Sequence, residues 1–125
     1  MDRTLIILGA LFGLLGTVAS GFAAHAAGAE NLTIAAHFLL FHAPVLLAVP
    51  ALIHTGLVRR LIAHVGGGLI FIGGALFSGE LALRALEGQS LFFMAAPIGG
   101  MILIAGWLII AIAALATSRH AITAH

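Results

Sequence analysis

Four long apolar stretches follow one another along the chain, and short polar stretches separate them. They cover about residues 4–27, 34–54, 61–86 and 94–117. An α-helix needs about 20 apolar residues to cross the hydrocarbon core of a bilayer. The pattern therefore predicts an all-α membrane protein, a four-transmembrane-helix antiparallel bundle, which forms a single membrane domain over residues 1–125.

The composition agrees with this class and excludes others. Of the 125 residues, 62% are hydrophobic and 7% are charged, and the mean hydropathy is +1.24. A water-soluble domain carries about 25% charged residues. This chain therefore has too few polar side chains to cover the surface of a water-soluble protein. The chain has no cysteine, which excludes disulfides and thiolate metal sites. The basic residues form no run, so the expected partner is the lipid bilayer and not nucleic acid.

The arginines predict an orientation. Four helices place both termini and the second loop on one side of the membrane, and most of the arginines fall on that side: Arg3, Arg59, Arg60 and Arg119. Cytoplasmic loops of membrane proteins carry an excess of basic residues. We therefore predict a multi-pass protein of the bacterial inner (cytoplasmic) membrane with both termini in the cytoplasm.

Small residues recur at helical spacing on three of the predicted helices. These stripes comprise Gly9, Gly13, Gly16 and Ser20; Gly67, Gly74, Ser78 and Ala82; and Gly99, Gly106 and Ala113. Small side chains let two helix backbones approach closely, which favours helix association in lipid. The stripes predict close-packed faces, and these faces suggest a homo-oligomer or a larger membrane complex.

A few ionisable side chains interrupt the apolar helices. A carboxylate at the centre of a membrane helix costs about 3 kcal/mol or more, so Glu80 should face protein or water. Arg84 follows one turn later, which predicts an ion pair. This pair is either structural or contains a carboxylate that exchanges protons. With the neighbouring polar residues it forms a candidate intramembrane polar site: His25, His37, His42, Ser78, Glu80 and Arg84.

The histidines allow more than one interpretation. His42 is either a neutral imidazole bonded to a carbonyl that Pro44 leaves free, or part of a proton relay or ligand set. His25 is either a helix-end cap or part of the same relay. We expect His64 to be solvated at the membrane interface and Trp107 to be a packing residue.

Five short motifs resemble those of one family of small membrane proteins. They are Ser20-Gly21-Phe22-Ala23-Ala24-His25, Phe41-His42-Ala43, Leu76-Phe77-Ser78-Gly79, Pro97-Ile98-Gly99-Gly100 and Gly106-Trp107. The chain resembles the domain-of-unknown-function 423 family, whose members are similar to transmembrane protein 256. The resemblance implies a four-helix inner-membrane protein without an assigned reaction, and it favours His25, His42 and Ser78 as residues with a shared role. The chain departs from the family pattern at Glu80, Ala82 and Ala96, where the family has serine, tyrosine and threonine.

Three functions are compatible with the sequence. The first is a small, non-enzymatic structural or accessory subunit, because the chain shows small-residue faces and no catalytic set, no cofactor motif and no metal-ligand motif. The alternative is a minimal proton-linked transporter or channel. It would use the histidine, glutamate and arginine side chains of the candidate polar site, which the predicted orientation places in the outer half of the membrane. The second alternative is a haem- or metal-binding four-helix protein with His25 or His42 as a ligand.

Overall fold

The computed structural model describes residues 2–123, with side chains described as far as Thr117, and these residues form four α-helices. The helices are α1 (Asp2–His25), α2 (Glu30–Thr55), α3 (Arg60–Glu87) and α4 (Ala95–Thr123). All four are long and apolar enough to cross a membrane, and the described chain contains no strand. The predicted class, a four-helix membrane protein, is confirmed. The side chains of Arg119 and His120, and all of His125, lie outside the described residues.

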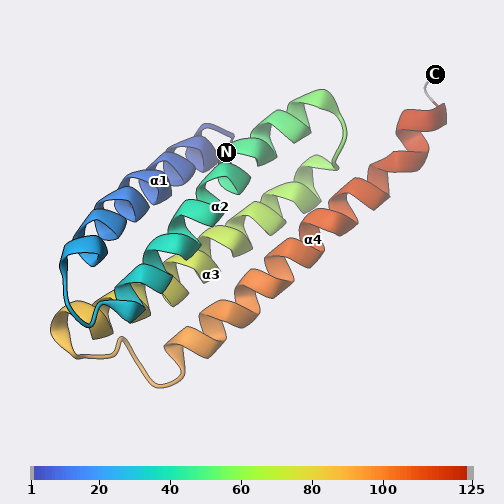
Figure 1. Ribbon diagram of the computed structural model, residues 1–125. Helices are drawn as coiled ribbons and strands as arrows, with labels where there is room; N and C mark the ends of the chain where they lie inside the picture. Colours follow the sequence, from blue (N-terminus) through green and yellow to red (C-terminus); the bar gives the residue numbers. More distant parts are fainter. Residues whose placement is uncertain (1, 124–125) are drawn as a thin grey trace.

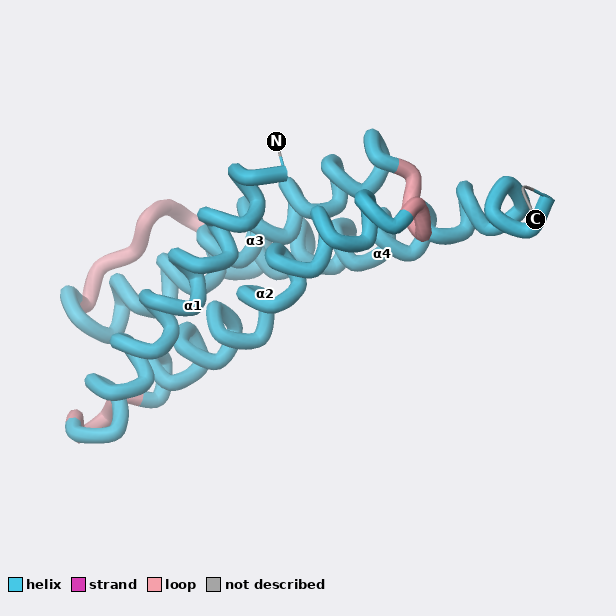
Figure 2. Tube along the Cα trace, turned by 90° about the horizontal axis from the view of Figure 1, so that it is seen from above, coloured by secondary structure: helices cyan, strands magenta, loops and turns pink. Residues whose placement is uncertain are grey.

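The helices form an open row instead of a closed square (Figure 1). Neighbours in sequence pack on each other, α1 on α2, α2 on α3 and α3 on α4. Among the described helices, the backbone of α4 comes close to that of α3 and to neither α1 nor α2. Figure 2 shows the same arrangement from above. One side of α4 is therefore free of close helix packing.

The two ends of the row differ. The start of α1 and the end of α4 lie at one end, called here the amino-terminal end, together with the loop of residues 56–59 (Figure 1). The loops of residues 26–29 and 88–94 lie at the other, called here the far end. At the amino-terminal end the Arg59 backbone N–H donates to the Ala113 carbonyl over 3.0 Å, and Thr117 Oγ1 donates to the Leu57 carbonyl over 2.9 Å. These bonds tie α4 to the α2–α3 loop.

Glycines bring α3 and α4 into backbone contact. A Cβ atom on Gly73 would lie 2.7 Å from the Leu103 nitrogen, and one on Gly99 would lie 2.7 Å from the Phe77 nitrogen. Such distances are below van der Waals contact, so only glycine fits. Gly9 and Gly16 play the same role between α1 and α2, facing Ala43 and Leu40. The predicted stripes on α1 and α4 are present, and they are occupied within the chain. On α3 the predicted Gly67 and Gly74 pack against the Leu5 and Phe12 side chains of α1, while the backbone contact with α4 is made by Gly66 and Gly73, which the prediction did not include.

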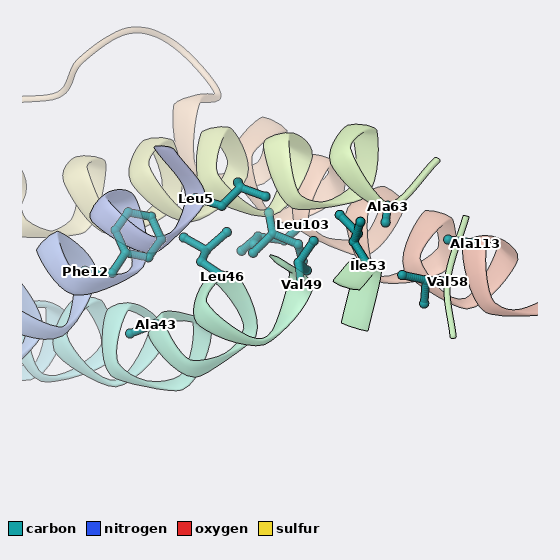
Figure 3. Packing of buried hydrophobic residues seen from close by; sticks show 11 residues of the cluster. Leu5, Phe12, Ala43, Leu46, Val49, Ile53, Val58, Ala63, Leu103 and Ala113 are labelled. Carbon is teal, nitrogen blue, oxygen red and sulfur yellow. The ribbon is translucent and has the colours of Figure 1, made fainter. Parts of the chain in front are cut away.

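Apolar side chains from all four helices form the core (Figure 3). Leu5 and Phe12 of α1 meet Leu46 and Val49 of α2, and Leu103 of α4 reaches the same cluster past α3. Leu46 is fully buried. A buried leucine contributes about 2 kcal/mol in water, but in lipid the gain comes from tight packing. The core holds the middle of the row together and leaves the space between α2 and α4 unfilled.

Candidate functional site

A groove runs between α2 and α4, with α3 at its base. Its volume is about 670 Å³, within the range of about 300–1,000 Å³ typical of small-molecule sites. The lining residues come from three helices: His37, Phe38, Phe41 and His42 of α2, Phe77 of α3, and Pro97, Gly100, Met101, Leu103, Ile104 and Trp107 of α4. None of these residues is an aspartate, glutamate, lysine or arginine. We call this space the α2–α4 groove.

One hydrogen bond crosses the groove. The indole N–H of Trp107 on α4 donates to Nε2 of His42 on α2 over 3.1 Å. His42 is 3% exposed, and its Nδ1 lies 2.7 Å from the Phe38 carbonyl oxygen. Each residue lies 12 positions beyond the start of its helix, so at about 1.5 Å per residue both sit ~18 Å from the far end. The bond therefore lies about midway along the two helices.

These two contacts fix the state of the imidazole. A carbonyl oxygen can only accept, so Nδ1 of His42 carries the hydrogen. An indole can only donate, so Nε2 is unprotonated. In this geometry His42 is a neutral imidazole with both nitrogens occupied. A second proton on the ring would break the bond to Trp107.

Two sequence-based expectations at this position need correction. The carbonyl that accepts from His42 belongs to Phe38, whereas the carbonyl that Pro44 leaves free is that of Leu40, one helical turn before the proline. Trp107 is more than a packing residue, because it is 42% exposed and donates to His42. The sequence carries no signal for this pairing, since 65 positions separate the two residues.

Glu80 lies near the far end of α3, where it binds Arg84 and two residues of the α3–α4 loop, Ser90 and Leu91. We call this set of contacts the Glu80 clasp. The carboxylate is fully buried. Its Oε1 accepts from Arg84 Nε over 2.7 Å and from Ser90 Oγ, and its Oε2 accepts from the Leu91 backbone N–H over 2.7 Å. The predicted ion pair is present, with the Arg84 side chain 49% exposed. Sequence reasoning missed Ser90 and Leu91, because a loop gives no periodic signal.

The remaining predicted site residues lie elsewhere. His37 is exposed and lines the α2–α4 groove. His25 is exposed at the end of α1, and Ser78 is buried beside a second groove, between α1 and α3. The Ser78 hydroxyl has no hydrogen-bond partner in the described part of the chain. The structure thus joins Glu80 to Arg84, and brings His37 and His42 to one groove, but no hydrogen bond or ion pair between described residues links these two pairs.

A polar cluster at the amino-terminal end was not expected. Asp2 of α1 accepts from two residues of α3: His64 Nε2 lies 2.7 Å from its carboxylate, and Arg60 lies 3.4 Å away. The His64 side chain is 9% exposed, so the expectation of a solvated His64 is wrong. These contacts join the first residues of α1 to the start of α3. Among residues 2–117, no three histidine, aspartate or glutamate side chains are grouped to hold a metal ion.

Comparison with known proteins gives a family. Residues 15–100 match the model of a family described as protein of unknown function, DUF423. The chain is 31% identical over 119 residues to a UPF0382 membrane protein of Staphylococcus saprophyticus, covering 88% of this chain and 95% of that one. It is 31% identical over 122 residues to a UPF0382 membrane protein of Staphylococcus epidermidis, covering 90% of this chain and 96% of the relative.

No solved structure matches the chain. The relatives are membrane proteins by name, and they cover nearly the full length of the four helices. The resemblance drawn from the five motifs is therefore confirmed. This chain is a small integral membrane protein that belongs to the DUF423 family, for which no activity is assigned.

Proposed function

We propose that the protein is a non-enzymatic accessory protein of the bacterial cytoplasmic membrane, and that it holds a lipophilic molecule in the α2–α4 groove. The observation that carries this proposal is the groove itself. It has the volume of a small-molecule site, an apolar lining without aspartate, glutamate, lysine or arginine, and a part-buried hydrogen bond about midway along the helices. Ligand sites are typically apolar with a few fixed polar groups.

The geometry of the ionisable groups favours binding over proton transfer. A relay needs successive titratable groups within hydrogen-bond reach. Both nitrogens of His42 face groups that do not titrate, an indole and a carbonyl. The Glu80 carboxylate accepts from Arg84, Ser90 and Leu91, and no hydrogen bond among the described residues continues from this clasp to His42.

The small-residue stripes support an accessory protein without requiring a homo-oligomer. Gly99 and Gly106 of the predicted α4 stripe face Gly73 and Gly66 of α3, and Gly67 and Gly74 of the predicted α3 stripe face the Leu5 and Phe12 side chains of α1. These stripes therefore stabilise the chain itself. The α2–α4 groove is the stronger candidate for an external contact, because it is a space that the four helices leave open.

The proposal includes an orientation. Arg3, Arg59 and Arg60 lie at the amino-terminal end, and Glu30 and Glu87 lie at the far end. The positive-inside rule then places both termini in the cytoplasm. In this orientation the groove extends from mid-membrane toward the outer leaflet, since Pro97 and His37 lie nearer the far end than His42 and Trp107.

Filling the groove tests the function. A Cβ atom on Gly100 would meet only the Phe77 ring, at 3.9 Å, so Gly100→Leu can extend a side chain into the groove. Gly68→Leu is the matched control, because nothing lies within 4 Å of a Cβ there. Protein would be purified in native-membrane discs, extracted with solvent, and the extract analysed by mass spectrometry. We expect a lipophilic component in the wild type and in Gly68→Leu that falls by roughly tenfold or more in Gly100→Leu.

An equal content of every extracted component in the three proteins, with Gly100→Leu folded by circular dichroism, would contradict the proposal. The Trp107 emission spectrum gives an internal check. It should shift in Gly100→Leu and not in Gly68→Leu, since Trp107 lines the filled space.

A further inference from the structure

We infer that the molecule held in the α2–α4 groove is neutral and carries a flat ring with a carbonyl or hydroxyl oxygen on a hydrophobic tail, as a lipid-soluble quinone does. This inference rests on the proposed function and adds the chemical class of the ligand. It follows from four properties of the groove: its aromatic lining, its lack of charge, one exposed imidazole and an opening to the bilayer.

The lining favours a flat ring. Four aromatic side chains border the groove in two pairs from different helices. The Phe38 and Phe77 ring centroids lie 4.4 Å apart, and the Phe41 and Trp107 centroids lie 6.4 Å apart. Aromatic rings interact with one another in offset or edge-to-face arrangements worth about 1 kcal/mol beyond their buried area. A saturated acyl chain would gain nothing from this geometry over an aliphatic lining.

The lining also excludes a charged head group. It contains no aspartate, glutamate, lysine or arginine to pair with a charge, and an unpaired charge inside a bilayer is expensive. A phosphate or ammonium group would therefore remain outside the groove. The part of the ligand that enters must be neutral.

His37 is the side chain placed to bind an oxygen atom of the ring. It is exposed, lines the groove, and makes no hydrogen bond within the described part of the chain. An imidazole N–H can donate to a carbonyl or hydroxyl oxygen. His42 is not available for this role, because Phe38 and Trp107 occupy its two nitrogens.

The groove also provides a path for a tail. Met101 and Ile104 line it and are 69% and 70% exposed. Both are apolar side chains on a helix that crosses the membrane. A hydrophobic tail can therefore leave the groove past these residues and lie among the lipids.

Trp107 is a built-in reporter for the test, because the chain has one tryptophan and no tyrosine. The experiment titrates decylubiquinone into the purified full-length protein in lipid nanodiscs and follows Trp107 fluorescence. We expect saturable quenching. His37→Ala should raise the half-saturating concentration by roughly fivefold, the effect of one hydrogen bond, and His37→Gln should restore part of the affinity through its amide donor.

His25→Ala is the matched control, since it removes another exposed histidine that does not line the α2–α4 groove and should leave the titration unchanged. Gly100→Leu should abolish the saturable component. Quenching that rises linearly in every variant, or displacement of the quinone by decanol at equal concentration, would overturn the ring assignment. Either result would leave the extraction test with Gly100→Leu intact, so the two proposals fail separately.

Discussion

The two faces of α4 differ at neighbouring residues. On one face, a Cβ atom at Gly99 would lie 2.7 Å from the backbone nitrogen of Phe77. On the next residue, a Cβ atom at Gly100 would meet only the Phe77 ring, at 3.9 Å. Gly99 therefore sits in a backbone-to-backbone contact with α3, while Gly100 borders the α2–α4 groove. A glycine in a membrane helix can serve close packing or can leave space for a ligand, and the neighbours decide which.

The polar groups differ between the faces as well. Along the packed face, α3 and α4 meet through glycines and apolar side chains, and the Glu80 clasp binds the loop that joins them. Across the groove, the Trp107–His42 hydrogen bond connects α4 to α2. The packed face thus holds α4 in place. The groove face is spanned by a single direct polar contact between these two helices among the described residues.

The largest expected effect is on the packed face. Gly73→Ala would place a Cβ atom 2.7 Å from the Leu103 nitrogen and 2.8 Å from the Gly99 carbonyl oxygen, so the two helices must separate. We expect a loss of about 3 kcal/mol in the free energy of unfolding. The measurement is SDS titration in mixed micelles followed by circular dichroism. Gly68→Ala, in open space, is the control and should be neutral or slightly stabilising.

A smaller loss is expected at the far end of the packed face. Glu80→Ala removes the acceptor for Ser90 Oγ and the Leu91 N–H and leaves Arg84 without its partner. The α3–α4 loop should loosen, and the melting temperature should fall by several degrees. Glu87→Ala, at an exposed carboxylate on the same helix, serves as the comparison. A melting temperature equal in both variants would mean that the clasp contributes nothing to stability.

The smallest stability effect belongs to the groove face. Trp107→Phe removes the N–H that His42 accepts and should cost about 1 kcal/mol. A double-mutant cycle with His42→Leu isolates the bond, because the two single changes remove the same contact. We expect a coupling energy of about 1 kcal/mol. A coupling near zero would show that the two side chains do not interact in the membrane.

The sequence predicts the helices well for a physical reason. A membrane helix must be apolar over about 20 residues, so each span leaves a clear signal in the chain. The stripes containing Gly99 and Gly106 also predict close packing, since spacing on a helix determines which residues share a face. The choice of partner helix is not encoded in that spacing, and these stripes proved to be used inside the chain.

The candidate site was harder to predict. The Glu80–Arg84 pair is local, one helical turn apart, and the sequence is sufficient to find it. Contacts between distant segments need the fold: Trp107 with His42, Ser90 with Glu80, and Asp2 with His64. The role of His25 and Ser78, which the family resemblance favours, stays a prediction.

The claim that α4 has one packed and one open face is tested most directly by comparing Gly99→Ala with Gly100→Ala. The two variants add the same methyl group to adjacent residues of one helix. We predict that Gly99→Ala lowers the free energy of unfolding by about 2 kcal/mol or more, while Gly100→Ala leaves it unchanged or raises it by up to about 1 kcal/mol. Equal losses in the two variants, measured by SDS titration, would contradict the open groove.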